Sequence, residues 1–304
     1  MSLSVGTSVH DQVLSVPAAQ RRELLGRIAD AGIDHVVVAD HVSFHGGTGF
    51  DGMVGAAAAL ATEDRLDVLV GVYQLALRHP MTVARQLASL NEMAPGRLSL
   101  GVGVGGEDRS EVTNCGVDPS TRGRRIDECL GVLRRLATGE PLDHDGEFFR
   151  IDSGVVLPAQ RPEIPILIGG KSDATVRRTV EHGDGWLGMF VSARRFAEFV
   201  AAIAERAEAA GRPVPDRHGF EVWCGLADDA GTARDLVAAK MQALYQLPFE
   251  RFERLCPAGT PKQVADFLRP YVDSGARSLT LVPCSTSWQA GVDAVAEVRS
   301  LLVG

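Results

Sequence analysis

The sequence predicts a (β/α)8 barrel, a TIM barrel with one excursion before its fifth strand. Eight short apolar runs of strand composition alternate almost strictly with helical patterns along the 304 residues. Such alternation is typical of a parallel sheet whose strands are connected by helical crossovers. Eight units close this barrel, which usually needs about 250 residues before insertions. No low-complexity linker divides the chain, so we predict a single domain over residues 1–304.

The predicted strands are apolar runs bounded by glycine, proline or polar residues. They cover Leu3–Val9, His35–Ala39, Leu66–Tyr73, Leu98–Val102, Pro165–Ile168, Gly185–Met189, Phe220–Leu226 and Ser278–Val282. Helical patterns lie between and after them, at Ala18–Ala31, Gly52–Thr62, Met81–Met93, Thr121–Ala137, Asp173–His182, Ala193–Ala210, Thr232–Gln246, Pro261–Ser274 and Gln289–Leu302. In Met81–Met93, the residues Val83, Ala84, Leu87 and Leu90 recur at helical spacing and indicate one apolar face that packs on a sheet.

Two segments do not fit the repeated units. From Gly139 to Glu163 the helical pattern stops, and the short alternating runs Glu147–Ile151 and Gly154–Leu157 indicate a hairpin-like excursion before the fifth strand. Pro248–Pro257 indicates a second insertion before the eighth strand. The competing fold is an open doubly wound sheet, because strand and helix alternation is common to both folds.

A glycine-rich turn after the fourth strand matches a dinucleotide-binding pattern. Gly101, Gly103 and Gly106 satisfy G-x-G-x-x-G, which in a Rossmann fold is followed at once by a helix and later by an acid that ends the next strand. Here a polar loop follows the glycines, and the acid at about the right distance, Asp127, lies in a helical pattern. We therefore assign the turn to the end of a barrel strand.

Composition excludes several classes of protein. The formal net charge is −8, which argues against a nucleic-acid surface because phosphate backbones need clustered Lys and Arg. The five cysteines are scattered and form no C-x-x-C pair, so neither a disulfide framework nor a zinc cage is indicated. The sequence shows no leader pattern and no apolar run near the roughly 18 residues of a membrane span. We expect a cytoplasmic protein that is not embedded in a membrane.

Asp40 and His41 follow the second strand, and residues that follow barrel strands meet at one face. Imidazole titrates near neutral pH, which suits proton transfer or hydrogen bonding to an anionic ring or substrate. The alternative is an N-cap aspartate beside an exposed histidine. His45 lies four residues after His41, but no helical pattern holds the two on one face and no third ligand is evident, so we predict no metal.

The turn Gly169, Gly170, Lys171, Ser172 joins the fifth strand to a helix. Glycines let backbone N–H groups approach an anion, and the helix N-terminus adds a partial positive charge. Lys171 and the Ser172 hydroxyl can supplement them, so the pattern favours a phosphate site over a simple capped turn. Aromatic residues near the strand ends are candidates to wall an aromatic cofactor, although strand aromatics more often belong to the core: Tyr73, Trp186, Phe190 and Trp223.

Several short motifs occur in a characteristic order and spacing. They are VADH at Val38–His41, RHP at Arg78–Pro80, GRLSLGVGVGGE at Gly96–Glu107, RGRRIDE at Arg122–Glu128, IGGKSDA at Ile168–Ala174 and GDGW at Gly183–Trp186. Taken together they resemble the bacterial luciferase-like flavin-dependent oxidoreductases, and the resemblance covers essentially the whole chain.

The resemblance implies the same barrel, with a flavin or deazaflavin bound where the strands end. It places the cofactor phosphate on Gly169, Gly170, Lys171 and Ser172. It also implies a cis peptide between Gly71 and Val72 behind the redox ring, with Gly103 and Gly105 beside it. Asp40 and His41 match an acid and a histidine of the active site, and His41 and Glu107 are expected to manage protons.

The resemblance favours coenzyme F420 over FMN. Asp-His after the second strand resembles the F420-dependent members, whereas the luciferases more often show Glu-His-His, and a glycine in the cis pair points the same way. Val104 stands where the luciferases carry a phosphate-reaching arginine. We therefore expect F420-dependent hydride transfer to or from a small organic substrate. An FMN-dependent monooxygenase and a non-catalytic flavin-binding protein are the alternatives, and a homodimer stays open.

Overall fold

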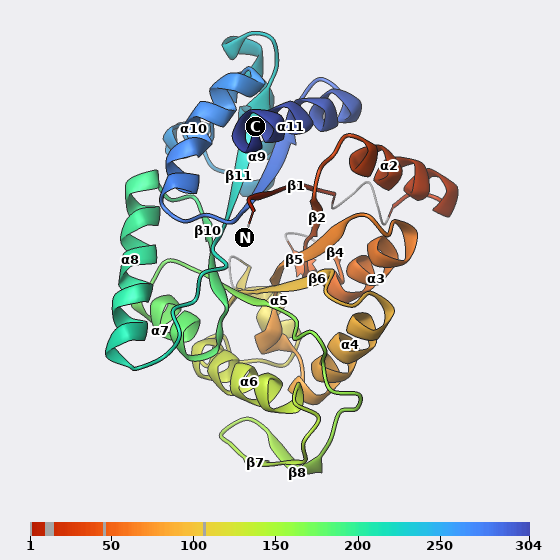
Figure 1. Ribbon diagram of the computed structural model, residues 1–304, viewed down its shortest axis with the longest axis vertical. Coiled ribbons are helices and arrows are strands. Elements are labelled where there is room, and N and C mark those ends of the chain that lie inside the picture. The colour runs from red at the N-terminus through yellow and green to blue at the C-terminus, as the bar shows by residue number, and fades with distance from the viewer. Residues whose placement is uncertain (1, 10–14, 45–46, 106–107) are drawn as a thin grey trace.

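The barrel strands form a closed ring in the computed structural model, which describes residues 2–9, 15–44, 47–105 and 108–304 (Figure 1). They are β1 (Ser4–Ser8), β2 (His35–Val38), β5 (Asp67–Tyr73), β6 (Leu98–Val102), β9 (Ile166–Gly169), β10 (Gly185–Met189), β11 (Gly219–Leu226) and β13 (Ser278–Cys284). Neighbours in this order pair in parallel, and β13 pairs with β1. The closed ring confirms the (β/α)8 barrel and excludes the open sheet.

Helices surround the ring and cover its outer face (Figure 1). They are α2 (Ala18–Asp30), α3 (Gly52–Thr62), α4 (Pro80–Met93), α6 (Arg122–Leu136), α7 (Asp173–His182), α8 (Ala193–Ala209), α9 (Ala230–Tyr245), α10 (Pro261–Asp273) and α11 (Trp288–Val303). All lie within two residues of the predicted helices, and the barrel strands agree as closely. None of the described helices is long and apolar enough to cross a bilayer.

Helix α4 shows why pattern and structure agree. Pro80 occupies its first turn, where a missing N–H leaves no hydrogen bond unmade, and the imidazole of His79 accepts the backbone N–H of Met81. The predicted apolar face is buried: Val83, Ala84, Leu87 and Leu90. These side chains belong to the main core, which fills the layer between strands and helices.

The excursion before the fifth barrel strand is a hairpin, as predicted, but its strands lie elsewhere. They are β7 (Leu142–Asp145) and β8 (Arg150–Gly154), paired antiparallel. The predicted bounds Glu147–Ile151 and Gly154–Leu157 are wrong because the first run crosses the turn, which the hydrogen bond from Gly146 N to Phe149 O closes. The second insertion contains two short 3₁₀ turns, η2 (Phe249–Arg251) and η3 (Glu253–Leu255), and β12 (Ala258–Gly259) follows it.

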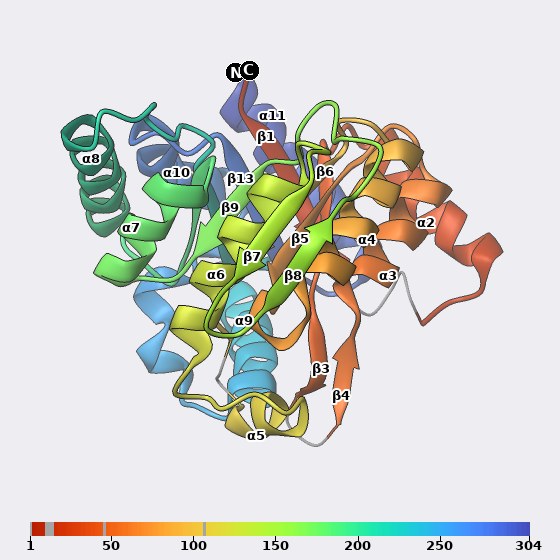
Figure 2. The same ribbon diagram turned by 90° about the horizontal axis from the view of Figure 1, so that it is seen from below.

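Further elements decorate the end of the barrel where the strands finish, which we call the mouth. A hairpin of β3 (His41–Phe44) and β4 (Thr48–Phe50) separates β2 from α3, and the short helix α5 (Arg109–Asn114) follows β6. Figure 2 shows these elements on the opposite side of the barrel from the two chain ends. Both were missed, because runs this short show no periodicity.

The inside of the barrel holds a second, smaller apolar layer, which we call the inner layer. It consists of Val37, Leu69, Leu167 and Leu187, with Val72 against it. Strand alternation explains this set, since Val36 and Val38, on either side of Val37, belong to the main core instead. Nearer the mouth, Gly71 and Gly169 lie two residues beyond Leu69 and Leu167 on the same faces of their strands.

Candidate active site

Asp40 lies at the end of β2 with its carboxylate buried and surrounded by donors. Arg78 binds it through Nη1 to Oδ2 at 2.6 Å and Nη2 to Oδ1 at 2.8 Å. The backbone N–H of Gln74 adds a bond of 2.9 Å and that of Gly52 one of 3.0 Å. Burial raises the pKa of the Asp40 carboxyl, while Arg78 and the two amides act in the opposite direction. This environment suits a residue that positions the loops and Arg78.

His41 begins β3 and its side chain is 37% exposed. Its Nδ1 lies 3.2 Å from Glu111 Oε2, and the imidazole packs on the Phe44 ring with the centroids 4.3 Å apart. When Nδ1–H donates to the carboxylate, Nε2 is the nitrogen left to exchange a proton with a ligand. These two contacts hold the imidazole in one orientation.

Glu111, on α5, is a buried carboxylate that sequence reasoning did not find. It accepts backbone N–H groups of Val42 and Ser43 as well as the imidazole of His41. Burial acts to raise the pKa of Glu111, but hydrogen bonds from Gln74, Ser43 and His41 outweigh it and hold the pKa below its usual value. Glu111 is therefore ionised at neutral pH and orients His41. Its short helix left no periodic signal in the sequence.

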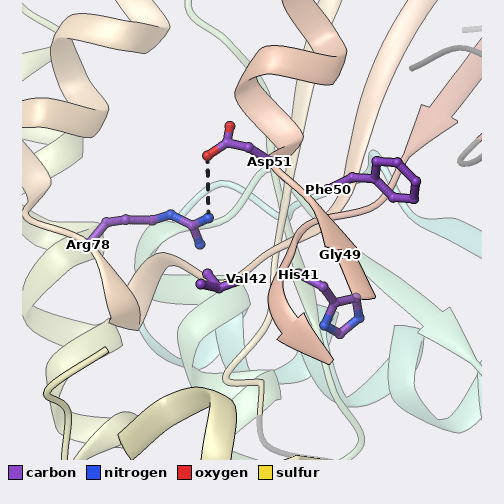
Figure 3. A pocket seen from close by; sticks show the side chains of 6 residues that line it. All are labelled: His41, Val42, Gly49, Phe50, Asp51 and Arg78. Atoms are coloured by element: carbon purple, nitrogen blue, oxygen red, sulfur yellow. Dashed lines mark ion pairs between the residues drawn. The ribbon is translucent and has the colours of Figure 1, made fainter. Parts of the chain in front are cut away.

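A pocket of about 250 Å³ opens between Arg78 and the β3–β4 hairpin. Figure 3 shows Arg78 directed at Asp51, with Nη2 and Oδ2 3.7 Å apart, and His41 at the far side of the pocket. Val42, Gly49 and Phe50 complete the lining. Ligand pockets usually measure about 300–1,000 Å³, so this one suits a substrate-sized fragment beside His41 rather than a complete cofactor.

The predicted cis peptide is present between Gly71 and Val72. Val72 stands among glycines, because a Cβ atom on Gly103 would lie 2.7 Å from its Cγ2 and one on Gly169 would lie 3.2 Å from its Cγ1. Gly105, with φ at +64°, packs as closely on Gln74, where a Cβ would lie 2.6 Å from Oε1. The structure thus brings the predicted glycines of three strand ends together around one peptide.

The turn from Gly169 to Ser172 lies at the end of β9, and Ser172 and Thr175 form a capping box at the start of α7. Gly170 has φ at +126°, and Lys171 and Ser172 are exposed. The Gly170 carbonyl accepts the indole N–H of Trp186 at 2.8 Å. An exposed glycine turn on a helix N-terminus is the geometry that anions bind.

The remaining candidates differ in where they lie. Glu107 lies outside the described residues. Tyr73 and Trp186 are buried in the main core, so they do not wall a pocket, whereas Phe190 and Trp223 belong to a partly buried aromatic cluster with Tyr245. Among the described residues no group of three His, Cys, Asp or Glu side chains could hold a metal.

Two buried polar atoms at the mouth have no hydrogen-bond partner within the described chain, Gln74 Oε1 and Trp223 Nε1. Buried polar groups are nearly always paired, so an unpaired acceptor and an unpaired donor indicate that a ligand completes the site. A flavin or deazaflavin ring carries both donors and acceptors, and the residues present therefore fit such a group.

Comparison with known proteins agrees with this geometry. Residues 2–247 match the family model described as luciferase-like monooxygenase. The F420-dependent hydroxymycolic acid dehydrogenase of Mycobacterium tuberculosis is 33% identical over 160 residues, which are 51% of this chain and 44% of that protein. The chain thus spans about half the length of this and other curated relatives.

Two solved structures share the fold. One is an F420-dependent secondary alcohol dehydrogenase in complex with an F420–acetone adduct, with a TM-score of 0.86, 19% identity and coverage of 99% of each chain. The other is the monooxygenase RslO1 from Streptomyces bottropensis, with a TM-score of 0.81, 23% identity and coverage of 98% of each chain. Because the family model matches most of this chain, residues 2–247, the chain belongs to the luciferase-like monooxygenase family.

Proposed function

We propose that this protein is an F420-dependent oxidoreductase that transfers a hydride to or from a small organic substrate. The observation that carries the proposal is the set of residues at the mouth, where the imidazole that Glu111 holds lines a pocket and glycines from neighbouring strand ends pack around Val72. The F420-dependent enzymes among its relatives and the Asp40-His41 pair support F420 over FMN. Free cysteines throughout the described chain suit a reducing cytoplasm.

Different residues of the mouth bind different parts of the cofactor. Gly169, Gly170, Lys171 and Ser172 hold the cofactor phosphate, and the redox ring lies against Gly71 and Val72 with Gly103 and Gly105 beside them. The bound deazaflavin supplies the hydride chemistry.

Side chains of the protein hold and transfer the proton. His41 Nε2 holds or accepts the substrate proton, and Glu111 keeps the imidazole in the orientation and tautomer that allow this. We propose Glu107 as a second proton carrier. Asp40 acts through Arg78 and the loop amides, as a positioning residue of the site.

An FMN-dependent monooxygenase is the second candidate, favoured by the overall likeness to RslO1. The residue at position 104 counts against it, because Val104 offers no charge to the FMN phosphate. A non-catalytic flavin-binding protein is the third reading, and the oriented His41–Glu111 pair counts against it. A homodimer remains part of the proposal, and its test is the mass in solution.

Equilibrium dialysis of the purified protein against F420 and FMN tests the cofactor. We expect tighter binding of F420, and oxidation or reduction of the bound F420 when a panel of small alcohols and ketones is added. Tighter FMN binding would overturn the F420 assignment and leave the fold untouched. Binding without turnover of any compound in the panel would favour the binding protein.

A further inference from the structure

Glu221 is an acid inside the barrel that the proposed reaction does not use. It lies on β11 between Phe220 and Val222, which both pack into the main core, so strand alternation turns Glu221 inward. Its Oε2 lies 3.7 Å from where a Cβ atom on Gly71 would stand. Because β5 and β11 are opposite each other in the ring, the side chain spans the lumen.

The height of Glu221 in the barrel places it at the mouth. Leu187 of the inner layer pairs in register with Gly219, and Met189 pairs with Glu221. Glu221 therefore stands one layer nearer the strand ends than the inner layer does. Its carboxyl reaches the cis peptide at Gly71, where the redox ring is proposed to lie.

Among the residues that the structure describes, none pairs with the carboxyl of Glu221. The residue is 8% exposed, and within the described chain no side chain or backbone N–H bonds to it. Burial raises the pKa of Glu221 to about 7, with no charged group contributing. A carboxyl turned into the lumen without a partner among the described residues is placed to meet a ligand there.

No charged group among the described neighbours of Glu221 stabilises the ionised form of its carboxyl. Thr280 is its register partner on β13, and the Thr280 hydroxyl is bonded to His35 Nε2 at 3.1 Å. Burial lowers the pKa of His35 to about 4, so this imidazole is neutral at neutral pH. On β10 the partner is Met189, and at the end of β2 the Asp40 carboxylate is turned toward Arg78. With a pKa of about 7, Glu221 is mostly protonated below neutral pH and loses its proton as pH rises through 7.

We propose that Glu221 is a ligand-binding residue whose carboxylic acid donates a hydrogen bond to an acceptor atom of the molecule at the barrel mouth. The acceptor is a carbonyl oxygen or a ring nitrogen, which the redox ring and a carbonyl substrate both offer. The indole N–H of Trp223, two residues along the same face of β11, is a second buried donor without a partner in the described chain. This inference rests on the proposed function.

A carboxylate cannot donate a hydrogen bond, so binding must weaken as Glu221 loses its proton. The test is the dissociation constant of F420, measured by fluorescence titration from about pH 6 to about pH 9, for wild type and Glu221 variants. We expect wild-type binding to weaken above about pH 7, approaching tenfold per pH unit. Glu221→Gln keeps a donor and should lose this pH dependence. Glu221→Leu should bind weakly at every pH.

Two comparisons make the result specific. Glu147→Gln, the same substitution at an exposed site in the excursion, should keep the wild-type profile. Thermal unfolding of the apoprotein shows whether Glu221 titrates: wild type should lose stability relative to Glu221→Gln as pH rises from about 4.5 to about 7, because the folded carboxyl binds its proton more tightly than the unfolded one.

The outcomes show whether the acceptor atom belongs to the redox ring or to the substrate. A pH dependence that Glu221→Gln abolishes in F420 binding assigns the acceptor to the ring. A pH dependence that appears only in kcat/KM, for a compound that the enzyme turns over, assigns the acceptor atom to the substrate. Equal profiles of wild type and Glu221→Gln in both measurements overturn the role of Glu221 while the proposed function stands. Failure of wild type to bind F420 or FMN overturns both.

Discussion

Buried carboxyl groups on the two sides of the barrel mouth differ in the hydrogen bonds that they receive. On the β2 and β5 side, Asp40 receives four hydrogen bonds, two of them from Arg78, and Glu111 accepts hydrogen bonds from the amides of Val42 and Ser43 and from His41. On the β11 side, Glu221 receives none from the described residues. The two carboxylates on the first side have hydrogen-bond partners before any ligand arrives, whereas Glu221 is proposed to gain its partner from the ligand. The contrast separates residues that build the site from residues that await its occupant.

Removing a carboxylate from the complete side should give the largest effect. Asp40→Ala leaves the Arg78 guanidinium, 17% exposed, without its main partner. Truncating one member of a buried ion pair typically costs about 3–5 kcal/mol, so we expect a loss of that order in the free energy of unfolding, measured with denaturant.

Two variants serve as references for Asp40→Ala. Glu147→Gln breaks the exposed pair with Arg124 and should cost about 0–1 kcal/mol. Glu221→Gln at alkaline pH should be neutral or stabilising, since no partner is lost. A loss below about 1 kcal/mol for Asp40→Ala would contradict the contrast between the two sides.

The second prediction concerns rate. His41→Ala should lower kcat by roughly 10²–10⁴, the usual contribution of general acid–base catalysis, while F420 affinity stays within a few-fold. Glu111→Gln, which acts through His41, should lower kcat less and shift its pH profile. Full turnover by His41→Ala would reduce this histidine to a neighbour of the site.

A third prediction compares the two ends of the lumen. His35, at the closed end, bonds to Ser4 at 2.8 Å and to Thr280 at 3.1 Å as a neutral imidazole. Its pKa falls from 6.5 to about 4 on folding, so the unfolded chain binds more protons in that window and stability should fall as pH drops through it, by roughly 3 kcal/mol.

Burial lowers the pKa of His218 in the same way, so both histidines contribute to this acid sensitivity. Denaturant unfolding at several pH values measures it, and His35→Gln should flatten the acid slope. An unchanged slope would mean that His35 is already protonated in the fold. Glu221 predicts the reverse sign, a loss of stability as pH rises from about 4.5 to about 7.

The smallest expected effect is at the glycine turn. Lys171→Met should weaken F420 binding about tenfold, by removing one exposed charge from the phosphate site, and the loss should shrink at high salt. Lys262→Met, at an exposed position of α10, is the matched control. Gly170 is a poor probe, because a side chain there would meet Thr175 Oγ1 at 2.5 Å and strain the turn itself. If F420 binding by the two variants responds equally to salt, the cofactor phosphate binds at another place.

The barrel could be predicted from sequence because each of its strands and helices has its own periodicity and punctuation. Asp40 and His41 could be placed because residues after barrel strands share one face. The partners of these residues could not, since Glu111 comes from a helix too short to show a period and reaches His41 only through the closed fold. Glu221 did leave a signal, a lone acid within the apolar strand Phe220–Leu226, but only the register shows what it faces.

The β3–β4 hairpin is held at its edges by bonds to main-chain atoms. Glu111 binds the amides of Val42 and Ser43, and Asp40 binds that of Gly52 just beyond the hairpin. Such anchors do not depend on which side chains the hairpin carries. The residues of the hairpin beyond His41 can therefore change without losing these bonds. Grafting the residues that a relative carries between His41 and Asp51 should leave the melting temperature nearly constant; a collapse in melting temperature would show that the hairpin sequence is tied to the barrel.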